Sequence, residues 1–126
     1  MGWHITDVEE LEDAIIELKL KLARKIGVNA GMTVVDLGCG QGGFTAALAK
    51  IVGKRGKVLA VDVSSEYSAE FTERLEKHGV KNIVTFIQTD AVKLKDVIPD
   101  EVADVVASYR LLEELKQPNA MPQIVK

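Results

Sequence analysis

The sequence has a single cysteine, Cys39, which excludes a disulfide bond within the chain and a metal site built from several cysteines. It has no apolar run close to the ~20 residues that a membrane-spanning helix needs. It also has no excess of basic residues, because 16 lysines and arginines stand against 19 acids and the net charge is -3. The chain as a whole therefore has no general electrostatic attraction for nucleic acid.

The amino-terminal residues and the composition bear on location and domain count. The first ten residues, MGWHITDVEE, are too acidic and too polar for a signal peptide. We therefore expect a cytoplasmic protein that does not enter a membrane. The length of 126 residues and the hydrophobic content of 47% predict one folded domain over residues 1–126.

The first predicted element is an amphipathic helix that ends at Gly27. Thr6 and Glu9 have the spacing of a capping box. Apolar residues then recur every three or four positions, which predicts one buried stripe. The residues of that stripe are Val8, Leu11, Ile15, Leu18, Leu22 and Ile26.

Strand and helix signals alternate through the rest of the chain. Apolar runs rich in β-branched residues predict four strands, MTVVDL, KVLAVDV, NIVTFIQ and ADVVASY. Between them we expect a helix at TAALAKIV, a helix capped by Ser64 or Ser65 and a short helix at VKLKDVI, with another helix at RLLEELK. This alternation predicts an α/β fold with a parallel sheet and helices on both faces. Ligands of such folds bind beyond the carboxyl ends of the strands.

The loop after the first strand is rich in glycine. Within VVDLGCGQGGFT, four glycines fall in six residues, between a predicted strand and a predicted helix. Gly38, Gly40 and Gly43 match G-x-G-x-x-G, which holds a pyrophosphate in dinucleotide-binding domains. Gly38, Gly40 and Gly42 match the tighter G-x-G-x-G. Glycine lets a backbone approach a ligand closely, so a loop that binds nothing is the weaker interpretation.

Two acids help to decide whether the glycine loop binds a pyrophosphate or a different ligand. Asp62 ends the second strand, 19 residues after Gly43, where a carboxylate accepts bonds from ribose hydroxyls. Its alternative role is to cap the next helix. Asp36 ends the first strand, and its charge beside a pyrophosphate would be unfavourable. Ribose together with a cation and without phosphate fits both acids, and S-adenosylmethionine has both groups.

The motifs resemble those of class I S-adenosylmethionine-dependent methyltransferases. VVDLGCGQGGFT looks like their first motif, VLAVDVS their second, IQTDAVKL their third, and ADVVASYRLLEEL their fourth strand with its helix. The resemblance runs from about Leu11 to Lys126 and is closest to small-molecule, quinone-methylating members. It implies a Rossmann-like sheet in the order 3-2-1-4, with Asp90 at the adenine amino group and Tyr109 near the transferred methyl. For Tyr109, packing alone is an equally good interpretation.

The resemblance also implies a set of cofactor-binding residues. We expect S-adenosylmethionine to contact Asp36, Gly38, Cys39, Gly40, Gly42, Asp62, Val63, Asp90, Ala91 and Ser108. No metal ligand and no general base can be named. The expected reaction is direct displacement, in which an acceptor attacks the sulfonium methyl and S-adenosylhomocysteine leaves. We expect a small-molecule acceptor rather than a nucleic acid or a protein. A binding module without turnover and a nicotinamide-dinucleotide binder stay open as alternatives.

The family usually has seven strands, and only four are found in this sequence. The chain therefore corresponds to the cofactor half of the fold, and the fourth strand is expected to lie at an edge. That strand, ADVVASY, has no lysine or proline to discourage pairing with another chain. We therefore expect a homodimer built around it. The alternative is that AMPQIVK folds back over the same edge.

Overall fold

The computed structural model describes residues 8–90, 93–97 and 102–109 of the chain. Its helices are α1 Val8–Lys25, α2 Gly43–Val52, α3 Ser68–Lys77 and α4 Leu94–Val97, with a 3-10 turn at Lys81–Ile83. Its strands are β1 Thr33–Leu37, β2 Lys57–Asp62, β3 Val84–Gln88 and β4 Val105–Ala107. Helices and strands therefore alternate as predicted.

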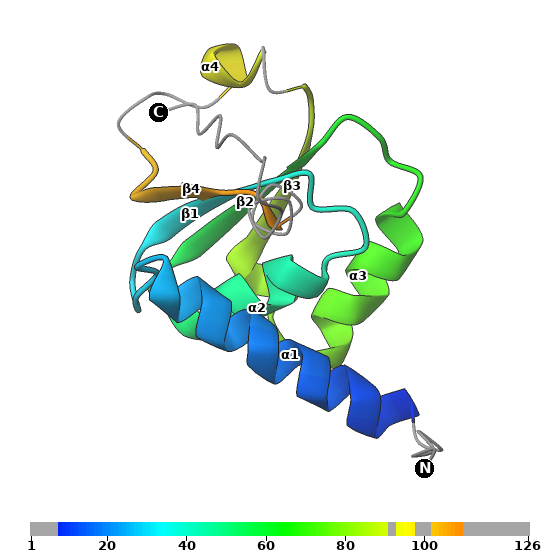
Figure 1. The fold of residues 1–126 in the computed structure, drawn as a ribbon. Helices are drawn as coiled ribbons and strands as arrows, with labels where there is room; N and C mark the ends of the chain where they lie inside the picture. Colours follow the sequence, from blue (N-terminus) through cyan, green and yellow to red (C-terminus); the bar gives the residue numbers. More distant parts are fainter. Residues whose placement is uncertain (1–7, 91–92, 98–101, 110–126) are drawn as a thin grey trace, which may run out of the picture.

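The described strands form one parallel sheet in the order β3-β2-β1-β4, which confirms the order that the resemblance implies. In the register of the sheet, Asp36 of β1 lies beside Ala60 of β2 and Ala107 of β4. Asp62 at the end of β2 lies beside Gln88 of β3. Asp36 and Asp62 therefore lie at the same end of the sheet, where all the strands have their carboxyl ends (Figure 1).

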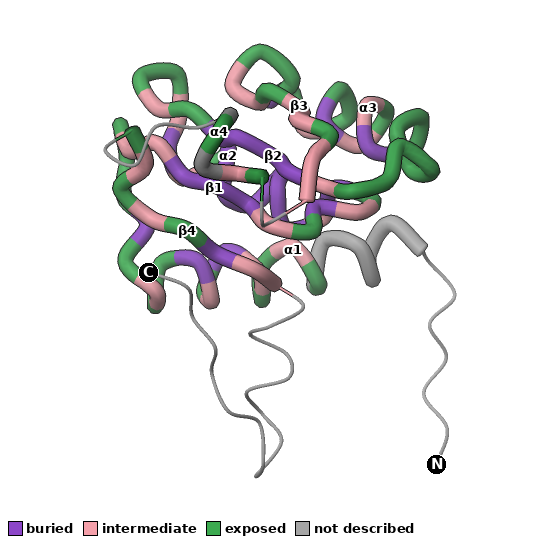
Figure 2. Tube along the Cα trace, turned by 90° about the horizontal axis from the view of Figure 1, so that it is seen from above, coloured by how far each residue is buried: buried purple, intermediate pink, exposed green. Residues whose placement is uncertain are grey.

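Helices cover both faces of the sheet, as predicted. Val34 and Val58 point into the larger core, which also contains residues of α1, α2 and α3. Their neighbours Val35 and Leu59 point to the opposite face, where Leu94 of α4 packs. This is the period of two that a strand imposes on its side chains. Figure 1 shows α1, α2 and α3 on one side of the sheet and α4 on the other. The two central strands, β1 and β2, are buried along most of their length (Figure 2).

The predicted buried stripe of α1 is wrong in part. Ile15 is 39% exposed and Leu18 is 66% exposed, whereas Leu20 and Ala23 are buried. Ala23 belongs to the core that α2 and the sheet share. The predicted set includes Ile15 and Leu18, and a second set with similar helical spacing includes Ile16, Leu20 and Ala23. Periodicity alone cannot show which of the two sets is buried. The small side chain of Ala23, 0% exposed, allows α1 to approach α2 closely and so decides which set is buried.

The predicted cap of α3 is wrong as well. The helix begins at Ser68, and the residue at its N-cap, Tyr67, makes no side-chain capping bond. The Ser64 hydroxyl instead accepts a bond from the Glu66 N–H at 3.0 Å, and the Ser65 carbonyl accepts one from the Ser68 N–H. Both serines therefore build the turn that precedes the helix.

Two strands are shorter than their apolar runs suggested. The 3-10 turn takes the first two residues of NIVTFIQ, and the ladder of ADVVASY is confined to Val105–Ala107. The expected helix at RLLEELK, the segment AMPQIVK and the capping residue Thr6 lie outside the described residues. In the part of the chain that the structure describes, no helix is long and apolar enough to cross a membrane.

Candidate functional site

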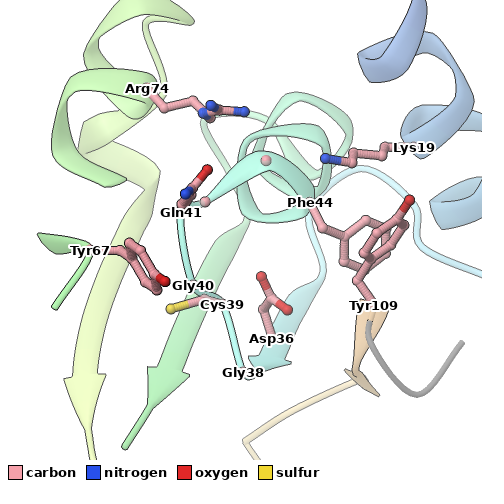
Figure 3. Close-up of a pocket in the computed structure, with 12 residues that line it drawn as sticks. Lys19, Asp36, Gly38, Cys39, Gly40, Gln41, Phe44, Tyr67, Arg74 and Tyr109 are labelled. Carbon is pink, nitrogen blue, oxygen red and sulfur yellow. The ribbon is translucent and has the colours of Figure 1, made fainter. Parts of the chain in front are cut away.

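A cavity of about 340 Å³ opens beside the glycine loop at the carboxyl ends of the strands. Its walls come from the loop after β1, from α1, from α3 with the turn before it, and from the end of β4 (Figure 3). Its lining residues are Lys19, Asp36, Gly38, Cys39, Gly40, Gln41, Gly42, Gly43, Phe44, Tyr67, Arg74 and Tyr109. The cavity therefore lies at the carboxyl ends of the strands, where the sequence predicts a ligand.

Gly38 and Gly40 form the part of the loop that a ligand can approach most closely. Their φ angles are +72° and +51°, in the left-handed region that favours glycine. A β-carbon on either residue would meet no protein atom within 4 Å, so that space is open to the cavity. The N–H groups of Gly38 and Cys39 donate to the Val61 carbonyl at 2.7 and 3.1 Å, which ties the loop to β2. The result is a cradle in which only backbone faces the ligand.

Gly42 is a glycine for a different reason. A β-carbon there would lie 2.7 Å from Cδ2 of Phe71, a buried ring of α3. Gly42 thus allows α3 to pack against the loop, although it also lines the cavity. Its match to the glycine pattern reflects packing as well as a ligand.

The Asp62 carboxylate holds the turns on either side of it. Its Oδ2 accepts a bond from the Gly40 N–H at 2.9 Å, and its Oδ1 accepts one from the Ser64 N–H at 3.1 Å. It does not cap α3, which begins at Ser68, so the capping alternative is wrong. A carboxylate has about four acceptor positions, and these two bonds leave the others for donors on a ligand.

Asp36 is a buried acid on the floor of the cavity. It is 1% exposed, and its Oδ2 accepts a bond from the Thr45 hydroxyl at 2.5 Å. Burial raises the pKa of Asp36 to about 7, and the charge of Asp62 adds to the rise. The Thr45 bond and the Lys19 ammonium act in the opposite direction on this pKa. A cationic ligand group would stabilise the ionised form further.

The other predicted site residues take varied positions. Cys39 is buried and lines the cavity. Val63 is 65% exposed directly after β2. Asp90 follows β3, and its Oδ1 accepts a bond from the Lys93 N–H at 2.8 Å. Ser108 is half-buried beyond β4. Four of the predicted residues are not among those that line the cavity, namely Asp62, Val63, Asp90 and Ser108. Ala91 lies outside the described residues.

Sequence reasoning expected Tyr109 near the site but missed the cavity residues Lys19, Phe44, Tyr67 and Arg74. Phe44 and Tyr109 pack with their ring centroids 5.2 Å apart, and the Lys19 ammonium lies 5.1 Å from the centroid of the Tyr109 ring. Tyr109 therefore both packs and lines the cavity. Lys19 falls three positions after Ile16, on the face of α1 that packs against the core, and apolar periodicity alone did not identify that face. Arg74 and Tyr67 gave no signal in the sequence.

The parallel sheet, the glycine loop after β1 and the acid at the end of β2 define a Rossmann-like nucleotide-binding domain. A family model described as a methyltransferase domain matches residues 28–126. The chain belongs to this methyltransferase family.

Relatives of known sequence and structure agree with this assignment. The chain is 36% identical over 80 residues to a ubiquinone/menaquinone biosynthesis C-methyltransferase, UbiE, of Azotobacter vinelandii. That match covers 64% of this chain and 31% of the relative, so the chain spans about a third of the relative's length.

Two solved structures show the same fold. A SAM-dependent methyltransferase of Aquifex aeolicus is 31% identical with a TM-score of 0.61, over 85% of this chain and 57% of that one. A SAM-dependent O-methyltransferase of Thermotoga maritima is 26% identical with a TM-score of 0.63, over 73% of this chain and 34% of that one.

Proposed function

We propose that this chain transfers a methyl group from S-adenosylmethionine to a small-molecule acceptor. The observation that carries the proposal is the open backbone cradle of Gly38 and Gly40 with the Asp36 and Asp62 carboxylates beside it. S-adenosylmethionine is the cofactor, and when bound it supplies an electrophilic methyl group on a sulfonium.

The residues that line the cavity, together with Asp62 behind the loop at Gly40, fit this cofactor. The open space over Gly38 and Gly40 admits a flat or bulky group against the backbone. Asp62 has acceptor positions left for the ribose hydroxyls. Asp36 lies where its charge favours a cation and disfavours a pyrophosphate. A nicotinamide dinucleotide fits the cradle and Asp62 but not Asp36.

The contribution of the protein to the reaction is orientation and exclusion of water. Holding two reactants in line removes much of the entropic barrier to displacement. Tyr109 and Phe44 present a packed aromatic wall on the β4 side of the cavity. Cys39 takes no part as a nucleophile, because burial and the nearby charges of Asp36 and Asp62 raise its pKa to about 12.

A small molecule is the acceptor class that we propose, and two observations support it. The cavity has a volume of about 340 Å³, which falls within the roughly 300–1,000 Å³ of small-molecule sites. The UbiE relatives carry the name of a quinone-biosynthesis enzyme. The acceptor atom stays open, because one relative is named a C-methyltransferase and another an O-methyltransferase.

Methyl transfer to cell extract tests this proposal. The chain is incubated with S-adenosylmethionine labelled in its methyl group, and the label is followed into small-molecule, nucleic-acid and protein fractions. We expect label in the small-molecule fraction, and none with the Gly40→Val variant. Label in RNA or protein would overturn the acceptor class. Binding of S-adenosylhomocysteine without any transfer would instead make the chain a cofactor-binding module.

Cofactor affinity should depend on pH through Asp36. The cation of S-adenosylmethionine favours the ionised carboxylate, and the pKa of Asp36 in the free protein is raised to about 7. Affinity should therefore fall by about tenfold from pH 8 to pH 6, and the Asp36→Asn variant should show no such fall. Calorimetric titration at three pH values measures it. An affinity of the unmodified chain that does not change with pH would show that Asp36 does not lie beside the cation of the cofactor.

The same raised pKa predicts the sign of a stability change. A carboxyl group whose pKa is higher in the folded chain favours folding while it is protonated. This contribution is fully present below the ordinary value of 3.8 and is lost as the pH rises through about 7. Asp36→Asn should remove this component from the pH profile of the thermal midpoint.

A homodimer through the β4 edge is a further part of the proposal. In the described sheet β4 has β1 on one side, and the order of strands ends there. Val102 and Val106 are each 45% exposed near this edge. Exposed strand edges with apolar side chains favour pairing with another chain. Light scattering at micromolar concentration should give twice the monomer mass. The Val106→Lys variant should give a mass closer to that of the monomer. A monomer mass that holds as concentration rises would contradict the dimer.

A further inference from the structure

Among the described residues, two polar side chains are buried, and they bond to each other. Thr45 is 0% exposed and Asp36 is 1% exposed. The Thr45 hydroxyl, on α2, donates to Oδ2 of Asp36, on β1, at 2.5 Å. Thr45 does not line the cavity, whereas Asp36 does. The hydroxyl can therefore act on a ligand only through Asp36.

Packing alone does not account for the hydroxyl of Thr45. The next four residues of α2 are buried and apolar. A valine, which is branched in the same way as threonine, would fill the same space without a polar group. A buried hydroxyl costs free energy unless it has a partner, and Asp36 is the partner that it has in the structure. The hydroxyl is thus tied to the acid on the cavity floor.

The two oxygens of the Asp36 carboxylate have different surroundings. Oδ2 bonds to Thr45 inside the protein, and Oδ1 has no bonding partner among the described residues. No buried side-chain oxygen in that part of the chain lacks a partner, so Oδ1 is open to the cavity. Figure 3 shows the Asp36 carboxylate beside the loop at Gly38 and Cys39. The Thr45 bond therefore fixes the carboxylate with one oxygen available to a ligand.

Several other groups act on the charge of Asp36. Burial raises the pKa of Asp36 to about 7, and the hydrogen bond from Thr45 is the next largest influence and lowers it. The Asp62 carboxylate, on β2, raises this pKa, and the Lys19 ammonium, on α1, lowers it. The Cys39 thiol is close but stays neutral, because its own pKa is about 12. The other titratable residues that line the cavity are Tyr67, Arg74 and Tyr109. The bond from Thr45 is thus the strongest influence in favour of the ionised form.

We propose that Thr45 is a positioning residue that keeps Asp36 ionised and directed at the cofactor, and so sets how strongly the site holds a cation. This inference rests on the proposed methyltransferase function and concerns the affinity of that same site. A hydrogen bond to an ionised acceptor is stronger than one to a neutral acceptor, so the bond stabilises the carboxylate more than the acid. Without the hydroxyl, Asp36 should take up a proton at a higher pH and lose its attraction for the cation.

Two matched pairs of chains isolate the hydroxyl. The unmodified chain and Thr45→Val have the same branched shape, and Thr45→Ser and Thr45→Ala both lack the methyl group, so each pair differs in the hydroxyl. The Asp36 carboxyl is titrated by NMR in the ligand-free chain with ¹³C-labelled aspartate, and its signal is the one that Asp36→Asn lacks.

In each pair, the chain without the hydroxyl should have a pKa of Asp36 that is higher by about one pH unit. A bond to an ionised acceptor is worth roughly tenfold more in an equilibrium constant than a bond to a neutral one. The second pair gives the answer if Thr45→Val does not fold. An equal pKa of Asp36 within the pairs would overturn the inference.

Cofactor binding shows whether this ionisation acts on the ligand. S-adenosylmethionine is titrated by calorimetry at pH 5, 7.5 and 9.5, and affinities are compared within a pair at the same pH, so that titration of the ligand itself cancels. The chain without the hydroxyl should bind about two- to threefold more weakly at pH 7.5 and nearly equally at pH 5 and 9.5, where Asp36 has the same charge in both chains. A ratio that is constant across pH would show that Thr45 only shapes the site, and would overturn the inference.

The two proposals can fail separately. An unmodified chain that does not bind S-adenosylmethionine at any pH would contradict the proposed function, whatever the NMR titration gives. Normal cofactor binding, with an equal pKa of Asp36 within the pairs, would contradict only the role of Thr45.

Discussion

Replacing Gly40 by valine should abolish cofactor binding while the chain stays folded. The φ angle of Gly40 is +51°, and a β-carbon there points into space that is free of protein atoms within 4 Å. The side chain therefore fills the cradle instead of disturbing the core. We expect the affinity for S-adenosylhomocysteine to fall by at least about a hundredfold, because the cofactor loses its contact with the loop backbone. Titration calorimetry measures the loss.

Backbone strain in that variant needs its own control. A valine in the left-handed region costs on the order of 1–2 kcal/mol whatever lies around it. Gly79 has a φ of +67° and the same open surroundings, but it lies after α3 and does not line the cavity. Gly79→Val should lose similar stability and keep its affinity. Near-normal binding of S-adenosylhomocysteine by a folded Gly40→Val variant would show that the glycine loop does not contact the cofactor.

Asp62→Ala should weaken cofactor binding by at least about tenfold. Each hydrogen bond to a charged carboxylate is worth ~1.5–3 kcal/mol, and ~1.4 kcal/mol is one decade of affinity. The structure adds a second reason, since the same carboxylate holds the Gly40 N–H at 2.9 Å and thereby fixes the loop. A loss under twofold, with circular dichroism unchanged, would exclude Asp62 from the site.

A cofactor analogue separates these two roles of Asp62. An S-adenosylhomocysteine analogue without ribose hydroxyls cannot bond to the carboxylate but still needs an ordered loop. If direct bonds to ribose dominate, Asp62→Ala should hardly change the affinity for this analogue. If loop ordering dominates, the variant should weaken both ligands equally. We expect the first result, because the Val61 carbonyl also holds the loop through Gly38 and Cys39.

The parts of the fold that could be predicted depend on local pattern. The glycine cradle and the position of Asp62 follow from short motifs, in which the spacing along the chain fixes the spacing in space. Gly38 and Gly40 are examples, because a sharp turn between a strand and a helix needs positive φ at these positions. Such features do not depend on contacts with distant parts of the chain. The strand order followed from the resemblance to a known family and not from the motifs themselves.

The parts that could not be predicted depend on contacts between distant elements. The buried face of α1 is set by how closely Ala23 approaches α2, which apolar periodicity does not encode. The start of α3 is set by Asp62, which takes the N–H of Ser64, so that the serines form a turn and not a cap. Arg74 reaches the cavity only because α3 packs beside α2. No short motif contains both ends of such contacts.

The most direct test of the cofactor is a pair of calorimetric titrations of the unmodified chain, one with S-adenosylhomocysteine and one with NAD. Both ligands carry a ribose that Asp62 can hold, and they differ in whether a cation or a pyrophosphate faces Asp36, which is 1% exposed on the cavity floor. We expect S-adenosylhomocysteine to bind and NAD to give no measurable heat of binding. Equal or tighter binding of NAD would contradict the account.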